Sequence, residues 1–189
     1  MKICWIDLET TGLDENKHGI IQIGSIIEED GVILDKFNIK LKPFKLDFLS
    51  KNALEINNTT IEQIKKYTNP LEAFDKFQKF LSNHVDKYDK YDKLILAGKN
   101  INAFDMKFLK RFFEKCNDDY FFSWFHKMGI DLNTTTAEYM IFNGFISDAY
   151  NLKTLCEAFA VNLDEHDAMS DIEATRKLYY IMKGITVDG

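Results

Sequence analysis

The sequence predicts an α/β fold in which a mixed five-stranded sheet, an antiparallel meander plus parallel strands, is flanked by helices. Strand-like segments come first along the chain, helix-like segments follow, and one short apolar run returns between the helices. This order of elements is typical of one sheet covered by helices. The 189 residues are enough for one domain with a substantial core, which we expect to span residues 1–185.

Three strands are expected near the start of the chain. Residues 2–8 are apolar and β-prone, and they run into a Thr-Thr-Gly turn cluster. Residues 20–29 and 32–42 are also strand-like, and Asp30 and Gly31 between them form a strong two-residue hairpin signal. Three strands in an antiparallel meander are the simplest interpretation.

Helical periodicity begins at Asp47. Short helices are expected over residues 47–56 and 59–67, and a longer helix is expected over residues 70–88, with Pro70 in its first turn. The longer helix carries an apolar stripe at three- and four-residue steps, which predicts a core-facing side made of Leu71, Phe74, Phe77, Leu81 and Val85.

A second type of strand is expected later in the chain. Residues 94–98 are a short unbroken apolar run, which predicts a strand buried on both faces and paired in parallel. A helix follows from about Asn102, and further helices lead to the last one over residues 168–183. Together with the meander, these elements are compatible with an RNase H-like fold.

Composition limits the classes of function. The formal net charge of −6 argues against a broad basic surface that coats duplex nucleic acid. It leaves room for an enzyme that holds a few nucleotides, because metal ions can supply the positive charge there. The three cysteines lie far apart without a CxxC pair, and neither a signal-peptide run nor a stretch of transmembrane length occurs. We therefore expect a cytoplasmic protein without a membrane partner.

Two acidic residues stand close together on the first predicted strand. Asp7 and Glu9 are two positions apart, so both carboxylates point to the same face. At about 4 Å and an effective dielectric near 20, two such charges repel by about 4 kcal/mol, which favours a divalent cation between them. An exposed strand end would explain the isolated pair equally well. The Thr-Thr-Gly turn beside it, however, offers backbone N–H groups that could hold a nucleotide.

Three segments resemble the motifs of a known enzyme family. Residues 7–13, DLETTGL, resemble the first motif of the DEDDh (DnaQ-like) 3′→5′ exonucleases, which include bacterial proofreading exonuclease subunits, RNase T and exonuclease I. Residues 98–109, GKNINAFDMKFL, are similar to the second block, G-H-N-x-x-x-F-D-x-x-F-L. Residues 166–175, HDAMSDIEAT, fit the third block, H-x-A-x-x-D-x-x-A-T, at all specified positions. The blocks occur in the family's order.

The resemblance implies a mechanism and a set of metal ligands. Such enzymes hydrolyse phosphodiester bonds from the 3′ end of single-stranded nucleic acid, release nucleoside 5′-monophosphates and use two Mg²⁺ or Mn²⁺ ions. Asp7 would bridge both ions, Glu9 and Asp171 would complete one site, and Asp105 would serve the second, partly through water. His166 would be the general base, a role that suits its ordinary pKa near 6.5.

Substrate contacts follow from the same resemblance. The turn Thr10, Thr11, Gly12 and Leu13 would bind the terminal nucleotide, with Leu13 as a wedge against the bases. Residues 53–57, ALEIN, are similar to the family's segment that touches the 3′ end, and the second block adds two more positions; the further candidates are Glu55, Ile56, Asn100 and Phe104. Ordinary packing is an equal alternative for Leu13 and Ile56 and the default for Phe104. Lys99 departs from the family pattern, in which histidine is common at this position.

Three interpretations of the function remain open at this point. The first is a DNA exonuclease, acting alone or with a polymerase partner, and the family favours it. The second is an RNA-trimming exoribonuclease, because this chemistry attacks the phosphate and need not contact the 2′-hydroxyl. The third is a non-catalytic nucleic-acid-binding module. The complete set of acids and His166 argues against the third interpretation, since binding alone has no chemical need for them.

Overall fold

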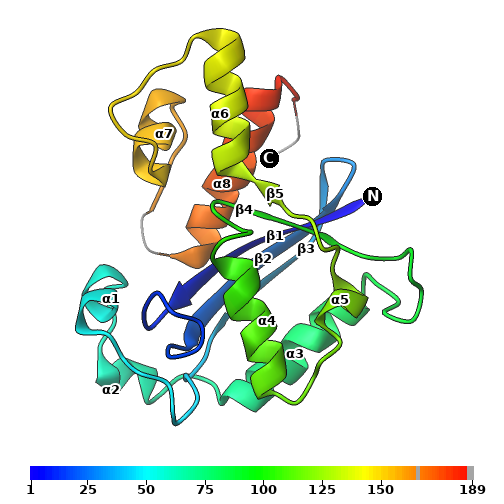
Figure 1. The fold of residues 1–189 in the computed structure, drawn as a ribbon, viewed down its shortest axis with the longest axis vertical. Coiled ribbons are helices and arrows are strands. Elements are labelled where there is room, and N and C mark those ends of the chain that lie inside the picture. Colours follow the sequence, from blue (N-terminus) through cyan, green and yellow to red (C-terminus); the bar gives the residue numbers. More distant parts are fainter. Residues whose placement is uncertain (165–166, 187–189) are drawn as a thin grey trace.

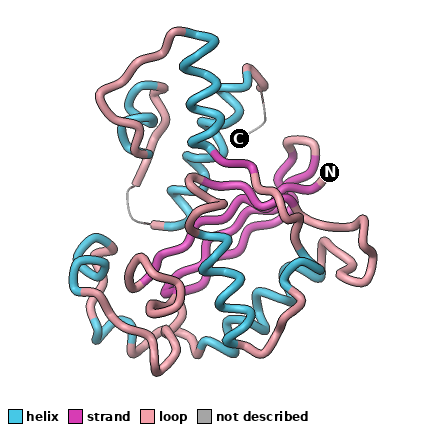
Figure 2. The backbone as a smooth tube through the Cα atoms, in the orientation of Figure 1, coloured by secondary structure: helices cyan, strands magenta, loops and turns pink. Residues whose placement is uncertain are grey.

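The computed structural model describes residues 1–164 and 167–186. Its centre is a five-stranded mixed sheet with the strand order β3-β2-β1-β4-β5, which confirms the predicted fold class. Figure 1 shows α3, α4 and α5 on one side of the sheet and α6, α7 and α8 on the other. Figure 2 shows the strands as one continuous layer between these helices.

The antiparallel meander is formed as predicted. β1 (Lys2–Thr10) pairs with β2 (Ile20–Glu29), and β2 pairs with β3 (Val32–Lys40). Asp30 and Gly31 have positive φ angles of 52° and 81°, as a tight two-residue hairpin requires. β1 continues two residues past the predicted end at residue 8, because Glu9 and Thr10 still pair with β2 across a bulge. β3 ends at Lys40 rather than at residue 42.

The parallel half of the sheet consists of two short strands. β4 (Ile95–Gly98) pairs in parallel with β1 and is largely buried, as its apolar run predicts. β5 (Ile130–Asp131) pairs in parallel with β4 at the sheet edge. β5 is only two residues long, so it carries no recognisable sequence pattern, and α6 begins directly after it.

An aromatic layer covers one face of the sheet. It is built from α3 (Pro70–Ser82), α4 (Asp105–Lys115) and α5 (Phe121–Trp124). The rings of Phe74 and Phe113 meet edge to face with centroids 4.8 Å apart, a favourable aromatic geometry. The remaining phenylalanines of the layer include Phe77, Phe80, Phe108, Phe112, Phe121 and Phe125. This layer positions α4, and with it Asp105, against the sheet.

The predicted apolar stripe is confirmed at four of its positions and wrong at the fifth. Phe74, Phe77 and Leu81 of α3 and Val85 past its end are buried, whereas Leu71 is 52% exposed. Leu71 lies in the first turn but faces away from the core, because Pro70 and Ala73 form the buried side there. α3 ends at Ser82 rather than at residue 88, and the chain past it continues in turns.

The opposite face of the sheet is covered by α8 (Ala168–Lys183), whose bounds equal the predicted 168–183. Trp5 and Ile26 of the sheet pack against Ile172 and Tyr180 of this helix. α6 (Leu132–Asn143) and α7 (Leu152–Ala158) pack on the outer side of α8 and form a second apolar cluster with it. The carboxylates on α8 are therefore placed by contacts on both sides of the helix.

A buried ion pair fixes α8 to β2. The Arg176 Nε donates to Glu28 Oε2 at 2.5 Å, and Arg176 Nη2 donates to the carbonyl of Gly31 at 2.8 Å. The hydroxyl of Tyr180 donates to the other oxygen of Glu28. Both charged side chains are almost fully buried, so each depends on the other for compensation of its charge.

The two remaining helices are shorter than predicted. α1 (Lys51–Ile56) begins four residues after the predicted start at residue 47, because the Asp47 side chain accepts the N–H of Phe44 and holds a turn there. α2 (Ile61–Ile64) begins after Thr60, which forms a capping box with Gln63.

α4 begins at Asp105 rather than near Asn102, after a turn that starts at Asn100.

In residues 1–164 and 167–186, no helix has the length and apolar character that crossing a bilayer requires.

Candidate active site

The site begins at the C-terminal end of β1. Asp7 lies opposite Gly24 of β2 and Glu9 lies opposite Gln22. Because cross-strand partners and alternate residues share one face, these four side-chain positions all point toward α8. Ile6 and Leu8, the residues between and beside the acids, point into the aromatic layer instead. The two-residue period of the strand thus places the acids on the α8 side and the apolar residues between and beside them in the aromatic layer.

α8 brings a third carboxylate to the two acids of β1. Asp171 lies in the first turn of this helix, which Asp167 caps by accepting the N–H of Ser170 at 3.4 Å. One ligand oxygen from each of Asp7, Glu9 and Asp171 lies within 4.8 Å of the other two, and all three residues are half-buried. The structure thus brings together the predicted acids of the first and third sequence motifs, which lie far apart in the chain.

Asp105 approaches the group from the first residue of α4. Its Oδ1 accepts the N–H of Leu8 at 3.1 Å, past the point where β4 stops pairing with β1 at Trp5. Among the described residues, the close set of three oxygens does not include Asp105, which is only 3% exposed. The fourth predicted carboxylate is therefore fixed directly against β1, beside the other three rather than among them.

The acids raise one another's affinity for protons. Burial, followed by repulsion from Asp105, Glu9 and Asp171, holds the pKa of Asp7 well above its usual range. Burial also raises the pKa of Asp105 to about 8, against the opposing effect of its hydrogen bonds with backbone N–H groups, and Glu9 adds to the increase. A bound divalent cation would favour the charged form of both carboxyls and so lower both pKa values. A set of carboxylate oxygens suits Mg²⁺ or Mn²⁺.

Asp105→Asn is expected to stabilise the metal-free protein at alkaline pH. The folded-state pKa of Asp105 is raised, so its contribution to stability is fully present below about pH 4 and is lost as the pH rises through about 8. Asparagine keeps the oxygen that accepts the Leu8 N–H and removes the charge. Urea unfolding in EDTA should show a higher free energy of unfolding for the variant than for the unaltered protein at about pH 8.5. This difference should shrink toward about pH 4.

The control for this pH dependence is Glu157→Gln, because Glu157 is exposed and lies on α7. Its effect on unfolding should vary little with pH. A gain for Asp105→Asn that is equal at both pH values would show that the carboxyl is not held in its protonated form by burial.

The predicted general base, His166, lies outside the described residues, as does Glu165 before it. The described chain resumes at Asp167, whose charge acts on Asp7.

The turn after β1 is held by its own side chains. Thr10 Oγ1 donates to the Gly12 carbonyl at 2.8 Å, and Thr11 Oγ1 donates to the Phe48 carbonyl at 2.6 Å. A Cβ on Gly12 would lie 2.2 Å from the His18 ring, so a larger residue there would displace this ring from the turn. The side chains of Thr10 and Thr11 are therefore occupied in shaping the turn.

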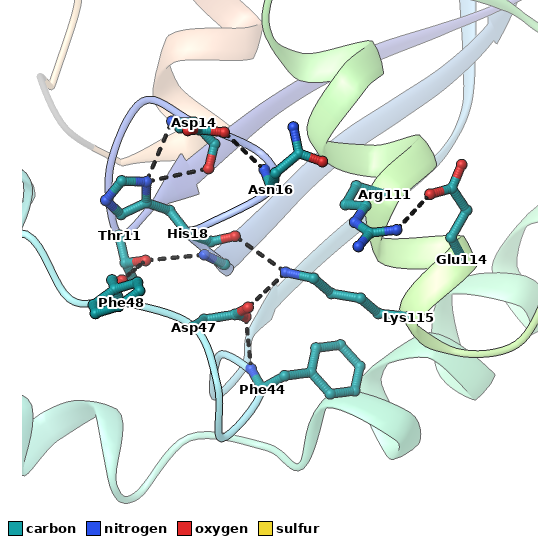
Figure 3. A network of polar contacts seen from close by, with 11 residues as sticks. Thr11, Asp14, Asn16, His18, Phe44, Asp47, Phe48, Arg111, Glu114 and Lys115 are labelled. Carbon is teal, nitrogen blue, oxygen red and sulfur yellow. Dashed lines mark hydrogen bonds and ion pairs between the residues drawn. The ribbon is translucent and has the colours of Figure 1, made fainter.

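A polar network connects this turn to α4 (Figure 3). Lys115 Nζ donates to Asp47 Oδ1 at 2.5 Å and to the carbonyl of His18 at 3.3 Å. The ring of His18 in turn accepts the N–H of Asp14 through Nδ1 at 3.3 Å. The turn and the segment around Asp47 are thus anchored to the same helix that carries Asp105.

The other predicted substrate contacts fall into two groups. Leu13 and Ile56 are 85% and 58% exposed, so packing does not account for either of them, and Glu55 is exposed on the same helix as Ile56. Phe104 instead packs its ring on Phe108, with centroids 4.8 Å apart, as the packing alternative expects.

The second motif begins with a tight turn beside Asp131. Asn100 has a positive φ of 60°, and its N–H donates to Asp131 Oδ1 at 2.9 Å. Lys99, at the position that departs from the family pattern, donates to Asn133 Oδ1 at 2.9 Å, and burial lowers its pKa. Asp131 also caps α6, so it joins the motif to a helix that the sequence motifs do not include.

Two polar residues near the acids were missed by the sequence analysis. Gln22 is only 3% exposed, and its Nε2 donates to Asp167 Oδ1 at 2.9 Å. The signal for Gln22 was a single amide in the apolar run of β2, and the signal for Asp167 was an acidic residue directly before a helix.

The sheet order and the acidic group at the end of β1 define an RNase H-like protein with a cluster of three carboxylates spaced as metal ligands are. The chain belongs to the RNase T exonuclease family, which it matches over residues 4–179. This family of DnaQ-like 3′→5′ exonuclease domains uses divalent metal ions.

Relatives and similar structures support this assignment. The chain is 32% identical over 110 residues to DNA polymerase III PolC-type of Thermotoga petrophila, covering 58% of this chain and 7% of the relative. The PolC-type polymerase of Lacticaseibacillus paracasei is 25% identical over 182 residues, covering 94% of this chain and 11% of the relative. The chain thus spans about a tenth of the length of these polymerases or less.

The fold is also that of a solved exonuclease. A crystal structure of E. coli exonuclease I in complex with a dT13 oligonucleotide superposes with a TM-score of 0.79 at 19% identity, covering 96% of this chain and 41% of that chain.

Proposed function

We propose that this chain is a metal-dependent 3′→5′ exonuclease that releases nucleoside 5′-monophosphates from single-stranded nucleic acid, with DNA as the favoured substrate. The observation that carries the proposal is the group Asp7, Glu9 and Asp171, drawn from two elements, with Asp105 fixed against the same strand. In-line attack of water on a phosphodiester needs concentrated positive charge, and this group of oxygens is suited to hold it. We further propose that residues 1–185 act as one exonuclease domain.

The proposed cofactors are two Mg²⁺ or Mn²⁺ ions. Asp7 would bridge both, Glu9 and Asp171 would complete one site, and Asp105 would serve the other. When bound, the two ions supply a nucleophile at neutral pH and compensate the charge that develops on the attacked phosphate. The protein side chains orient the ions, and the anchored turn of Thr10 to Leu13 holds the terminal nucleotide. The exposure of Leu13 supports its proposed role as a wedge against the bases.

His166→Ala is expected to slow turnover about a hundredfold or more, which is the usual effect of losing a general base. The imidazole would take the proton of the attacking water, and alanine cannot. Single-turnover cleavage of a 5′-labelled strand at saturating Mg²⁺ measures the effect. His126→Ala is the matched control, since the His126 N–H donates to the Leu94 carbonyl just before β4, beside the N-terminal end of β1 and away from Asp7, and it should leave the rate unchanged. An unaltered rate in His166→Ala would assign the base to another group.

The substrate class is tested with DNA and RNA strands of the same sequence. Both are labelled at the 5′ end and incubated with Mg²⁺ or with EDTA, and Asp7→Asn serves as the inactive control. We expect a ladder of products shortened from the 3′ end, formed faster on DNA. Faster shortening of RNA would favour an exoribonuclease, and binding without shortening in Mg²⁺ would favour a non-catalytic module.

A polymerase is the partner class that the relatives suggest, because they are DNA polymerase III PolC-type proteins. An exonuclease that serves a polymerase should prefer a frayed 3′ end. Comparing a primer–template with a mismatched terminal pair against a fully paired one measures this preference. Equal rates on both would argue for a role apart from proofreading.

A further inference from the structure

The strand β2 holds none of the clustered carboxylates, yet two of its residues lie on the same rungs as the two acids of β1. Gln22 is the cross-strand partner of Glu9, and Gly24 is the partner of Asp7. Partners in an antiparallel pair share a face, so both residues point toward the start of α8. α8 is the helix that carries Asp171.

Gln22 forms a polar connection from the sheet to the cap of that helix. Its Nε2 donates to Asp167 Oδ1 at 2.9 Å and to Asn38 Oδ1, also at 2.9 Å. A carboxylate only accepts hydrogen bonds, so the amide nitrogen must be the atom that faces Asp167. With two hydrogens for two acceptors, and with Gln22 itself 3% exposed, the amide is held in one orientation.

Gly24 determines how close the helix comes to the sheet. A Cβ at this position would lie 2.9 Å from the carbonyl carbon of Ala168 and 3.0 Å from its oxygen. Real side chains do not approach backbone atoms this closely, so the first residue of α8 occupies the space that only a glycine leaves free.

The N-cap residue Asp167 and the proposed metal ligand Asp171 are separated by one helical turn. The Asp171 N–H donates to the Asp167 carbonyl at 3.0 Å, and residues four apart lie on the same side of a helix. A shift of Asp167 along the sheet therefore moves Asp171 by a similar amount. Metal ligands tolerate little such displacement, because their donor distances are narrowly defined.

We infer that Gln22 is a positioning residue for the metal centre: its hydrogen bond to Asp167, together with the close approach at Gly24, holds Asp171 opposite Asp7 and Glu9. The inference rests on the proposed metal-dependent function. It assigns a role to a strand that contributes no ligand, and it makes cation affinity depend on an uncharged amide.

The test is Mn²⁺ binding by Gln22→Met, followed by electron paramagnetic resonance of the free ion. Methionine keeps the length of the side chain and loses the donor. We expect Mn²⁺ affinity to fall about tenfold or more, as is usual when a group that orients a ligand is removed. Unchanged affinity would overturn the inference.

The matched control is Gln78→Met. Gln78 also donates from Nε2 to an aspartate, Asp118 Oδ2 at 2.6 Å, but it connects α3 with the chain after α4. Thermal unfolding in EDTA should show comparable losses for the two variants, while only Gln22→Met weakens Mn²⁺ binding. An equal loss of Mn²⁺ affinity in both variants would reduce Gln22 to a general structural role.

Two further variants alter the same hydrogen bond, between Gln22 and Asp167, at its acceptor. Asp167→Ser retains a good N-cap but is too short to reach Gln22. Asp167→Asn keeps the length of the side chain and one accepting oxygen, which the Gln22 amide can still use, while its Nδ2 cannot accept the Ser170 N–H. We expect a larger loss of Mn²⁺ affinity for serine than for asparagine, and no further loss when Gln22→Met is added to serine, because both remove one bond. If Gln22→Met does not fold, equal affinities of the serine and asparagine variants overturn the inference.

These results separate the inference from the proposed function. Gln22-dependent Mn²⁺ binding in a chain that shortens no nucleic acid would refute the exonuclease activity alone. Nuclease activity with Mn²⁺ binding indifferent to Gln22 would refute the positioning role alone. Absence of Mn²⁺ binding by the unaltered chain would overturn both.

Discussion

Asp7→Asn should lower the rate of 3′-end hydrolysis by about a thousandfold or more, since metal ions contribute several kcal/mol to such a reaction and each 1.4 kcal/mol is about tenfold. Asp7 contributes an oxygen to the close group on β1 and α8, and an amide is a weaker ligand for a hard cation. Release of mononucleotides at saturating Mg²⁺ measures the loss.

The same substitution should increase the stability of the metal-free protein, although it lowers the rate of hydrolysis. Because repulsion and burial raise the pKa of Asp7, removing its charge should raise the unfolding midpoint of the metal-free protein near neutral pH. The control is Asp35→Asn on β3, whose carboxylate contacts His84 and not α8. Substantial activity in Asp7→Asn would remove this residue from the mechanism, and a lowered midpoint would contradict the electrostatic account.

The second large effect concerns the buried ion pair between β2 and α8. Arg176→Met is expected to lower the free energy of unfolding by about 3–5 kcal/mol, because it leaves the carboxylate of Glu28 buried without its charged partner. Urea unfolding in EDTA measures the change without a contribution from bound metal.

Two comparisons identify the cause of this loss. Lys36→Met breaks the exposed pair of Lys36 and Glu173, which also joins the sheet to α8, and should cost less than about 1 kcal/mol. Glu28→Met combined with Arg176→Met should recover much of the loss, because no charge is then left buried. A single Arg176→Met variant as mild as Lys36→Met would show that water reaches Glu28.

The sequence predicted elements where one local rule determined them. Asp30 and Gly31 favour a tight hairpin, so the meander was predictable. The last helix was predicted with its observed bounds, and the structure shows why it begins and ends there: Asp167 caps it and Gly184 ends it with a positive φ. The ends of the shorter helices depend on distant partners instead. Asp47, for example, is kept out of α1 by bonds to Phe44 and to Lys115 of α4.

The site was predictable in its membership more than in its geometry. The resemblance of three segments to the exonuclease motifs implied which acids meet, and the structure brings Asp7, Glu9 and Asp171 together. That Asp105 would accept the Leu8 N–H follows from where β4 ends, which no motif records. Gln22 was missed because its partner lies 145 residues away, and a lone amide in a largely apolar strand shows no partner in the sequence.

The alternation along β1 has a practical consequence for protein engineering. Ile6 and Leu8 face the phenylalanine layer, while Asp7 and Glu9 face α8, so the side chains that fill this layer lie on the other side of β1 from the proposed metal ligands. Substitutions that improve packing between α3 and α5 should therefore raise the thermal stability without changing the arrangement of the clustered acids.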